Sequence, residues 1–371
     1  MTLSRGAIGN LVNRYRAVLR KCRMMNVFGS LAVAGMLVAG NAGFAGAEEL
    51  SGDISPISLS GDTRNIIGVG DISLRSTEPA LRYLINVSGQ GQLDISMSNG
   101  SPMAVGNADG IYLKDYSDYD QYASAFHVAG SGSSGSFVGT GTFSMVGGGK
   151  LLGVCAFLSE SKGTLTLSGD ITGEAEAVMN GSNGYASFAA AAAGGNLVFG
   201  GDRTTLRAKA STGNNANGAF VKYGGMIDFA SKSVLIESKN TDSSSVGINC
   251  ADGTVKTSAD TDLDIVVEGN KATTGIQLTA SSSDVQLAGN LDLTATQTGQ
   301  DSFASVLGIS NDSGKMVVSG PTSLRLATNA PFDAKGITAS GKADMSFLGD
   351  VEIAVTGSAS GSALYTTYRY D

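Results

Sequence analysis

Three acidic side chains at alternate positions are the first candidates for chemistry in this sequence. Asp260, Asp262 and Asp264 repeat with a period of two, so on a β-strand all three point from the same face. There they could hold a cation or a polar substrate, or supply the paired carboxylates of a glycoside hydrolase. A solvated outer face of a strand explains the same spacing, and we prefer that interpretation.

A cluster of tyrosines and aspartates is the second candidate. A tyrosine combines an apolar ring with a polar hydroxyl, so this composition favours contact with a sugar or a protein over acid–base chemistry. A plain surface loop is the alternative. The candidate binding residues are Tyr112, Asp115, Tyr116, Asp118, Tyr119, Asp120 and Tyr122.

Other catalytic and cofactor motifs are not found. His127 is the only histidine and no G-x-S-x-G motif accompanies it, so we expect no catalytic triad. Residues 130–135 match G-x-G-x-x-G literally, but no strand followed by a helix frames them, and we expect a flexible linker there. With one histidine and three cysteines in 371 residues, we predict no catalytic residue, metal ligand or cofactor.

The elements that would position these residues form a repeat. Short apolar alternations bounded by glycine recur at intervals of 27 to 32 residues, and a second motif of a small residue, glycine and an aliphatic residue recurs between them. The first motif starts at Gly163, Gly195, Gly225, Gly253, Ser283, Gly314 and Gly341, and the second lies near Gly153, Gly184, Gly218, Gly247, Gly275, Gly308 and Gly336.

Each repeat reads as short strands joined by turns. Apolar residues alternate, as in Leu165 and Leu167, Leu291 and Leu293, or Val351 and Ile353. No segment offers the amphipathic helix of a βαβ unit, and a lone unit cannot bury its apolar stripe, so successive units must stack. The sequence therefore predicts an all-β right-handed parallel β-helix of about ten coils. An antiparallel β-sandwich array is the alternative.

Three parts of the chain follow from this pattern. Residues 1–47 form an N-terminal leader, residues 48–150 an N-terminal cap with irregular coils and a loop, and residues 151–371 the regular β-helix. Cys155 and Cys250 lie about three repeats apart, or roughly 14 Å along the axis, which is too far for a disulfide. We expect both to be buried free thiols.

The leader has the layout of a secretory signal peptide with an extended basic region. Six basic residues and no acidic ones precede an uncharged run from Asn26 to Ala47, and its apolar core is too short for a membrane span. Ala45-Gly46-Ala47 is an A-x-A site, so we expect cleavage after Ala47. A transmembrane anchor is the alternative.

Removal of this leader leaves a strongly acidic chain. Taking its 6 basic residues from the total of 25 leaves 19, against 33 acidic residues, for a net charge of −14. Nucleic acids and anionic membranes bind clustered lysine and arginine, which this sequence lacks. We therefore predict no nucleic-acid partner.

The leader, the glycine-rich composition and the stacked strand–turn units together resemble an autotransporter passenger of the pectin-lyase-like β-helix class. The segment NRYRAVLRKCRMM is similar to the extended signal peptide region of such proteins. The resemblance implies the secretion machinery and an outer-membrane barrel as partners, and display at the surface of a Gram-negative bacterium. No membrane-type strands follow the repeats, so we expect the barrel outside this chain, or a truncated chain that stays in the periplasm.

The function expected from these observations is non-enzymatic adhesion or another cell-surface interaction with a glycan or protein. A polysaccharide lyase or hydrolase on the same scaffold is the runner-up, and it would be favoured if Asp260, Asp262, Asp264 and Arg203 lined one groove. A structural fragment without its own ligand is the third interpretation.

Overall fold

The fold is all-β and consists of parallel strands stacked into a solenoid of about nine turns, close to the ten predicted. The computed structural model divides into residues 1–47 and 48–371. It describes residues 47–78, 81–98, 100–107, 122–148, 153–178, 186–211, 215–299, 305–329, 333–357 and 361–367. The predicted signal peptide up to residue 46 lies outside these residues.

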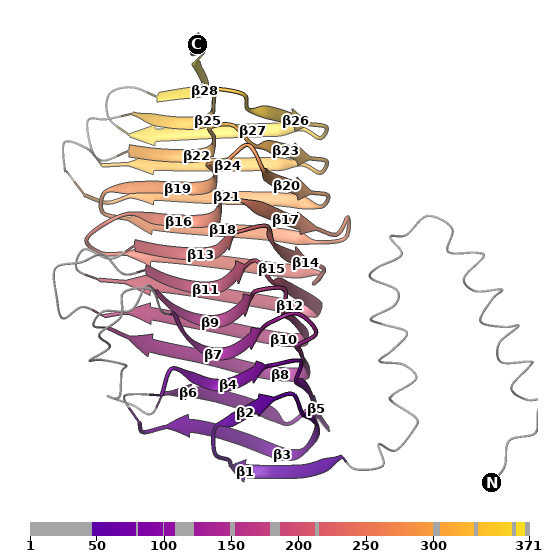
Figure 1. Cartoon of the computed structure of the whole chain (residues 1–371). Helices are drawn as coiled ribbons and strands as arrows, with labels where there is room; N and C mark the ends of the chain where they lie inside the picture. The colour runs from indigo at the N-terminus through magenta and orange to yellow at the C-terminus, as the bar shows by residue number, and fades with distance from the viewer. Residues whose placement is uncertain are drawn as a thin grey trace, which may run out of the picture. The chain divides into compact units, whose positions relative to one another are not determined.

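Each turn of the solenoid contributes strands to three faces (Figure 1). A 17-stranded sheet forms the first and second faces, and an 11-stranded sheet forms the third. Five strands of the larger sheet belong to turns in which the first and second faces are continuous: β1 (Glu48–Asp53), β3 (Thr63–Ser76), β8 (Ser134–Gly147), β10 (Thr164–Ala177) and β12 (Asn196–Ala210).

In the other turns a corner separates the first face from the second. The first-face strands are β5 (Gln92–Met97), β14 (Gly225–Phe229), β17 (Gly253–Thr257), β20 (Ser283–Leu287), β23 (Lys315–Val318) and β26 (Asp344–Phe347). The second-face strands are β6 (Pro102–Asn107), β15 (Ser233–Asn240), β18 (Asp262–Gly269), β21 (Asn290–Gln297), β24 (Thr322–Thr328) and β27 (Val351–Gly357).

The 11-stranded sheet forms the third face. Its strands are β2 (Ile57–Ser60), β4 (Tyr83–Ser88), β7 (Tyr122–Ala129), β9 (Gly153–Glu160), β11 (Ala186–Ala193), β13 (Asn215–Lys222), β16 (Ser245–Cys250), β19 (Ala272–Leu278), β22 (Ser305–Asn311), β25 (Ala334–Ser340) and β28 (Gly361–Thr367). The predicted motif of a small residue, glycine and an aliphatic residue lies on β9, β13, β16, β19, β22 and β25, whereas Gly184 lies outside the described residues.

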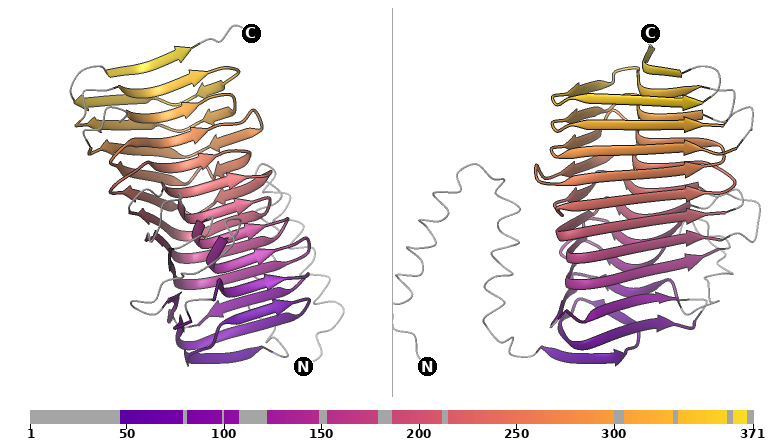
Figure 2. Two further views of the ribbon diagram at one scale, coloured as in Figure 1. Left: turned by 60° about the vertical axis from the view of Figure 1, so that its left-hand side comes forward. Right: turned by 180° about the vertical axis from the view of Figure 1, so that it is seen from behind.

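Successive turns pair in parallel and in register along one axis (Figure 2). On the second face Leu263 pairs with Leu291, and on the third face Ile248 pairs with Ile276. The strands before residue 150 stack in the same way, since β8 pairs with both β5 and β10. The alternative of an antiparallel sandwich array is therefore wrong.

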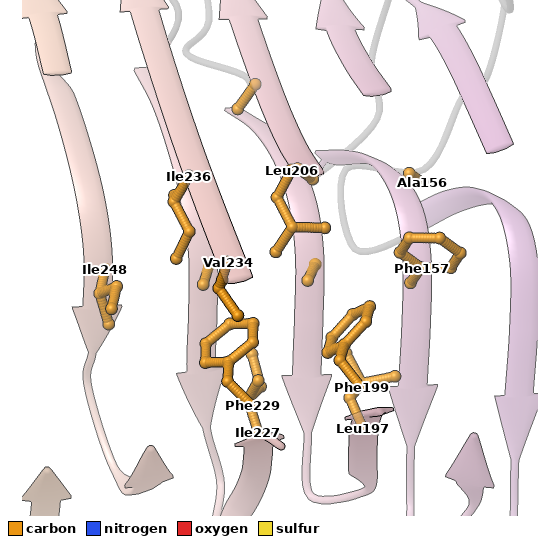
Figure 3. Close-up of a cluster of buried hydrophobic side chains, with 14 of the residues drawn as sticks. Ala156, Phe157, Leu197, Phe199, Leu206, Ile227, Phe229, Val234, Ile236 and Ile248 are labelled. Atoms are coloured by element: carbon orange, nitrogen blue, oxygen red, sulfur yellow. The ribbon is translucent and has the colours of Figure 1, made fainter. Parts of the chain in front are cut away.

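Inward side chains form the core that the repeat predicts. Leu165, Leu167, Leu291 and Leu293 are at most 1% exposed. Phenylalanine rings meet inside the solenoid (Figure 3). Phe199 stacks on Phe229 of the next turn, and Phe157 from the third face meets Phe199 edge-on, with ring centroids 5.5 Å apart in both pairs. Such aromatic contacts add to the burial of apolar area.

Two predictions from the sequence need correction. Residues 130–135 are not a flexible linker, because Gly130–Ser133 make a turn and β8 begins at Ser134. Val351, which the alternation predicts to face the core, is 40% exposed, because none of the described strands pairs with β27 on the side away from β24. A glycine- and serine-rich composition does not show whether a segment pairs with other strands. An alternating apolar pattern does not show whether a strand has paired neighbours on both sides.

A ladder of glycines lets the third face lie close to the second. Gly218, Gly247, Gly275 and Gly308 occupy equivalent positions in successive turns. A Cβ atom at Gly275 would lie 2.5 Å from the carbonyl oxygen of Gly308 and closer still to the side chain of Leu293. Any side chain there would push the sheets apart, which explains the recurring glycine.

We predict that Gly275→Ala lowers the free energy of unfolding by about 1–3 kcal/mol, because the methyl group has no room. Gly200→Ala is the matched control, since its nearest neighbour would be 3.7 Å away. The control changes the free energy by no more than about 0.5 kcal/mol. Denaturant unfolding measures both, and equal effects would contradict the close approach.

Candidate functional site

Of the seven predicted binding residues, the structure describes Tyr122. The other six, Tyr112, Asp115, Tyr116, Asp118, Tyr119 and Asp120, lie outside the described residues. Tyr122 is the first residue of β7 and is 6% exposed, so its ring is buried rather than presented to solvent.

Tyr122 belongs to an apolar cluster on the outward side of the third face. This aromatic cluster consists of Tyr122, Cys155, Leu158, Phe188 and Ala191, with Tyr83, Ala186 and Phe220 packed against it. The rings of Tyr122 and Phe188 meet edge-on, with centroids 6.0 Å apart, and Phe188 stacks on Phe220 at 4.8 Å. Apolar outward positions distinguish this part of the third face from the polar outer face of β18, where Asp262 and Asp264 alternate with buried residues.

An arginine connects the two tyrosines at the edge of the aromatic cluster. Arg82 Nη2 donates a hydrogen bond to the Tyr83 hydroxyl at 2.7 Å, and Arg82 Nε donates to the Tyr122 carbonyl oxygen at 3.2 Å. Burial raises the pKa of Tyr83 to about 12, although the nearby Arg82 opposes this shift. Burial raises the pKa of Tyr122 further, so both phenols are neutral at physiological pH.

His127 links three turns of the third face. Its ring stacks on Tyr83 at 4.0 Å, its Nδ1 lies 2.8 Å from Asn86 Oδ1, and its Nε2 lies 3.0 Å from Glu160 Oε2. These partners come from β4 and β9, the neighbours of β7 on either side. Both ring nitrogens therefore hold the sheet together, and neither faces a hydroxyl or thiol nucleophile.

Lys222 and Tyr223 lie at the exposed edge of the aromatic cluster, where β13 ends. Lys222 Nζ lies 4.6 Å from the ring centroid of Tyr223, 5.0 Å from that of Tyr122 and 5.6 Å from that of Phe220. Tyr223 is 71% exposed and has a φ of 56°. Neither residue could be identified from the sequence, because their proximity to Tyr122 arises from pairing between turns.

Cys155 and Cys250 are buried free thiols, as predicted. Cys155 lies on β9 and Cys250 on β16, three turns apart in the third face. Burial raises the pKa of Cys250 to about 11 and that of Cys155 well above its usual value. Both are therefore neutral apolar fillers under physiological conditions.

The three predicted carboxylates lie at the start of the second face. Asp260 is in the turn before β18, and Asp262 and Asp264 point outward from β18 into solvent. Asp264 pairs in register with Asp292 of the next turn. Partial burial and the nearby carboxylates of Asp292 and Asp262 raise the pKa of Asp264.

An acidic groove continues from these residues over the next turns. It has a volume of about 380 Å³ and includes Asp292, Asp350 and Glu352 in its lining. Arg325 Nη1 lies 3.2 Å from Asp292 Oδ1 at the solvent-exposed surface. Asp292 could have been predicted from the sequence repeat, because it occupies in the next repeat the position that Asp264 occupies in its own.

The groove is not the one that the sequence predicted for a lyase or hydrolase. Arg203 and Asp262 stand in the same outward column, separated by Ser233 of the intervening turn. The residues that line the groove do not include Arg203, Asp260, Asp262 or Asp264. The described residues contain no group of three or more histidine, cysteine, aspartate or glutamate side chains arranged to hold a metal ion.

No protein-family model, curated protein or solved structure matches the chain. Within the part of the chain that the structure describes, no helix is long and apolar enough to cross a membrane.

Proposed function

We propose that this chain is an exported β-helix protein, similar to an autotransporter passenger, that acts at the surface of a Gram-negative bacterium. In this proposal it binds a glycan or protein on a neighbouring or host cell and catalyses no reaction. The observation that carries the proposal is the regular parallel stack of about nine turns. At about 4.8 Å per turn, the stack holds its outer faces along a rod of roughly 40 Å.

Two features of the surface support a binding role. Lys222 and the exposed Tyr223 lie at the edge of the aromatic cluster, and these residue types suit recognition of polar ligands with apolar faces. Charged residues on the second face pair with one another between turns, as Arg207 does with Glu174 and Glu237. Such exposed pairs contribute little to stability, so these faces remain available for contact.

We predict that the full chain expressed in a Gram-negative host is recovered outside the cytoplasm with Glu48 as its first residue. Intact-mass measurement of the fractionated protein determines the cleavage site. Replacement of Ala45 and Ala47 by arginine removes the A-x-A site and leaves the leader attached. Recovery of the unprocessed wild-type chain from the cytoplasm would contradict export.

Binding to cells is measured separately from export. The purified mature chain, labelled with a fluorophore, should bind to whole bacterial or epithelial cells in a saturable manner. Failure to bind any cell type would contradict the surface-interaction role, even if the chain is exported.

A polysaccharide lyase or hydrolase is the second candidate function, and the acidic groove favours it. Asp292 with Arg325, together with Asp350 and Glu352, offers carboxylates beside a cation. If the groove is catalytic, polygalacturonate incubated with the chain, with or without calcium, yields new reducing ends or unsaturated products, and Asp292→Asn abolishes them. Absence of products from the wild-type chain under both conditions would contradict this candidate.

A further inference from the structure

We propose that Lys222 and Tyr223 form a saccharide-binding platform at the edge of the third face. This inference rests on the proposed surface-binding function and names the place and the ligand class within it. It uses the exposed ring of Tyr223 and the half-buried side chain of Lys222 beside the aromatic cluster.

The fold does not require a tyrosine at position 223. Tyr223 is 71% exposed, whereas Tyr122 in the neighbouring aromatic cluster is 6% exposed. Tyr223 and Gly224 form the corner after β13 with φ values of 56° and 70°. Glycine adopts this left-handed region without strain, whereas a bulky residue rarely does. A tyrosine at this corner therefore stabilises neither the core nor the turn, and its ring is free to contact a ligand.

Lys222 supplies a positioned hydrogen-bond donor beside that ring. Its ammonium group lies within 5.6 Å of three aromatic centroids, which favours a fixed position through cation–π attraction. None of the described carboxylates forms an ion pair with it, in contrast to Lys256, which pairs with Asp228 at 2.9 Å. Its N–H groups remain able to donate to an incoming oxygen atom.

These two groups match the chemistry of a pyranose. A sugar ring presents a face of C–H groups, which packs on an aromatic ring, and a rim of hydroxyl or carboxylate oxygens, which accept hydrogen bonds from an ammonium group. The acidic surface disfavours a phosphate polymer.

A broad apolar protein interface is also disfavoured. The large apolar side chains that are exposed in the described part of the chain are scattered over different strands and corners: Val69, Tyr223, Val266, Leu348 and Val351. A stable protein partner needs about 800 Å² of contact on each side, which a single exposed ring does not supply. The observations therefore favour a small ligand that one ring can cover.

The experiment uses the mature chain on a printed array of neutral and uronic-acid oligosaccharides, followed by calorimetry with each saccharide that binds. Tyr223→Gly removes the ring and relieves the left-handed backbone, so it keeps or raises the Tm. Lys222→Met removes the donor. Leu348→Ala is the matched control, because Leu348 is also 71% exposed but lies on the corner after β26.

We expect at least one saccharide to bind, Tyr223→Gly and Lys222→Met to raise its Kd by about tenfold or more, and Leu348→Ala to leave it unchanged. Binding that Tyr223→Gly leaves intact would overturn the platform while the proposed function stands. Binding of cells but of no saccharide on the array would also overturn the platform alone. If the wild-type mature chain binds neither a saccharide nor cells, the proposed function is overturned as well.

Discussion

Parallel pairing between equivalent residues of successive turns is the constraint on which this structure depends. Each turn exposes unpaired backbone groups on both edges, so it is stable only against the turns before and after it. Equivalent positions must therefore carry compatible side chains, such as the glycines at 218, 247, 275 and 308 or the stacked rings of Phe199 and Phe229. The same pairing brings Tyr122, Phe188 and Lys222, which are far apart in sequence, into one cluster.

The repeat was sufficient to predict the fold, because the spacing of glycine and apolar residues reflects the length of one turn. It also predicted the state of Cys155 and Cys250 from their separation in turns. It failed where a local signal conflicts with stacking. The glycine and serine residues from Gly130 onward have a linker composition, yet the turn and strand that they form pair with both neighbouring turns.

The candidate site was only partly predictable. The sequence pointed to Tyr122 and to Asp262 and Asp264, but contacts between turns decide what these residues do. Tyr122 is buried, and its neighbour Lys222 comes from a strand three positions further along the third face. Asp264 lies next to a second carboxylate, because Asp292 pairs with it in the following turn. Composition identifies such residues as polar or aromatic, and only the register shows which of them meet.

A cross-linking measurement tests the parallel register most directly. Val266 on β18 pairs with Thr294 on β21, whereas Ala354 on β27 occupies the same column two turns further on. Partners about 4.8 Å apart can form a disulfide, and residues three turns apart, at roughly 14 Å, cannot. We predict that mild oxidation cross-links the Val266→Cys/Thr294→Cys variant completely and leaves Val266→Cys/Ala354→Cys reduced. A reduced first variant, or an intramolecular cross-link in the second, would contradict the stacked parallel solenoid.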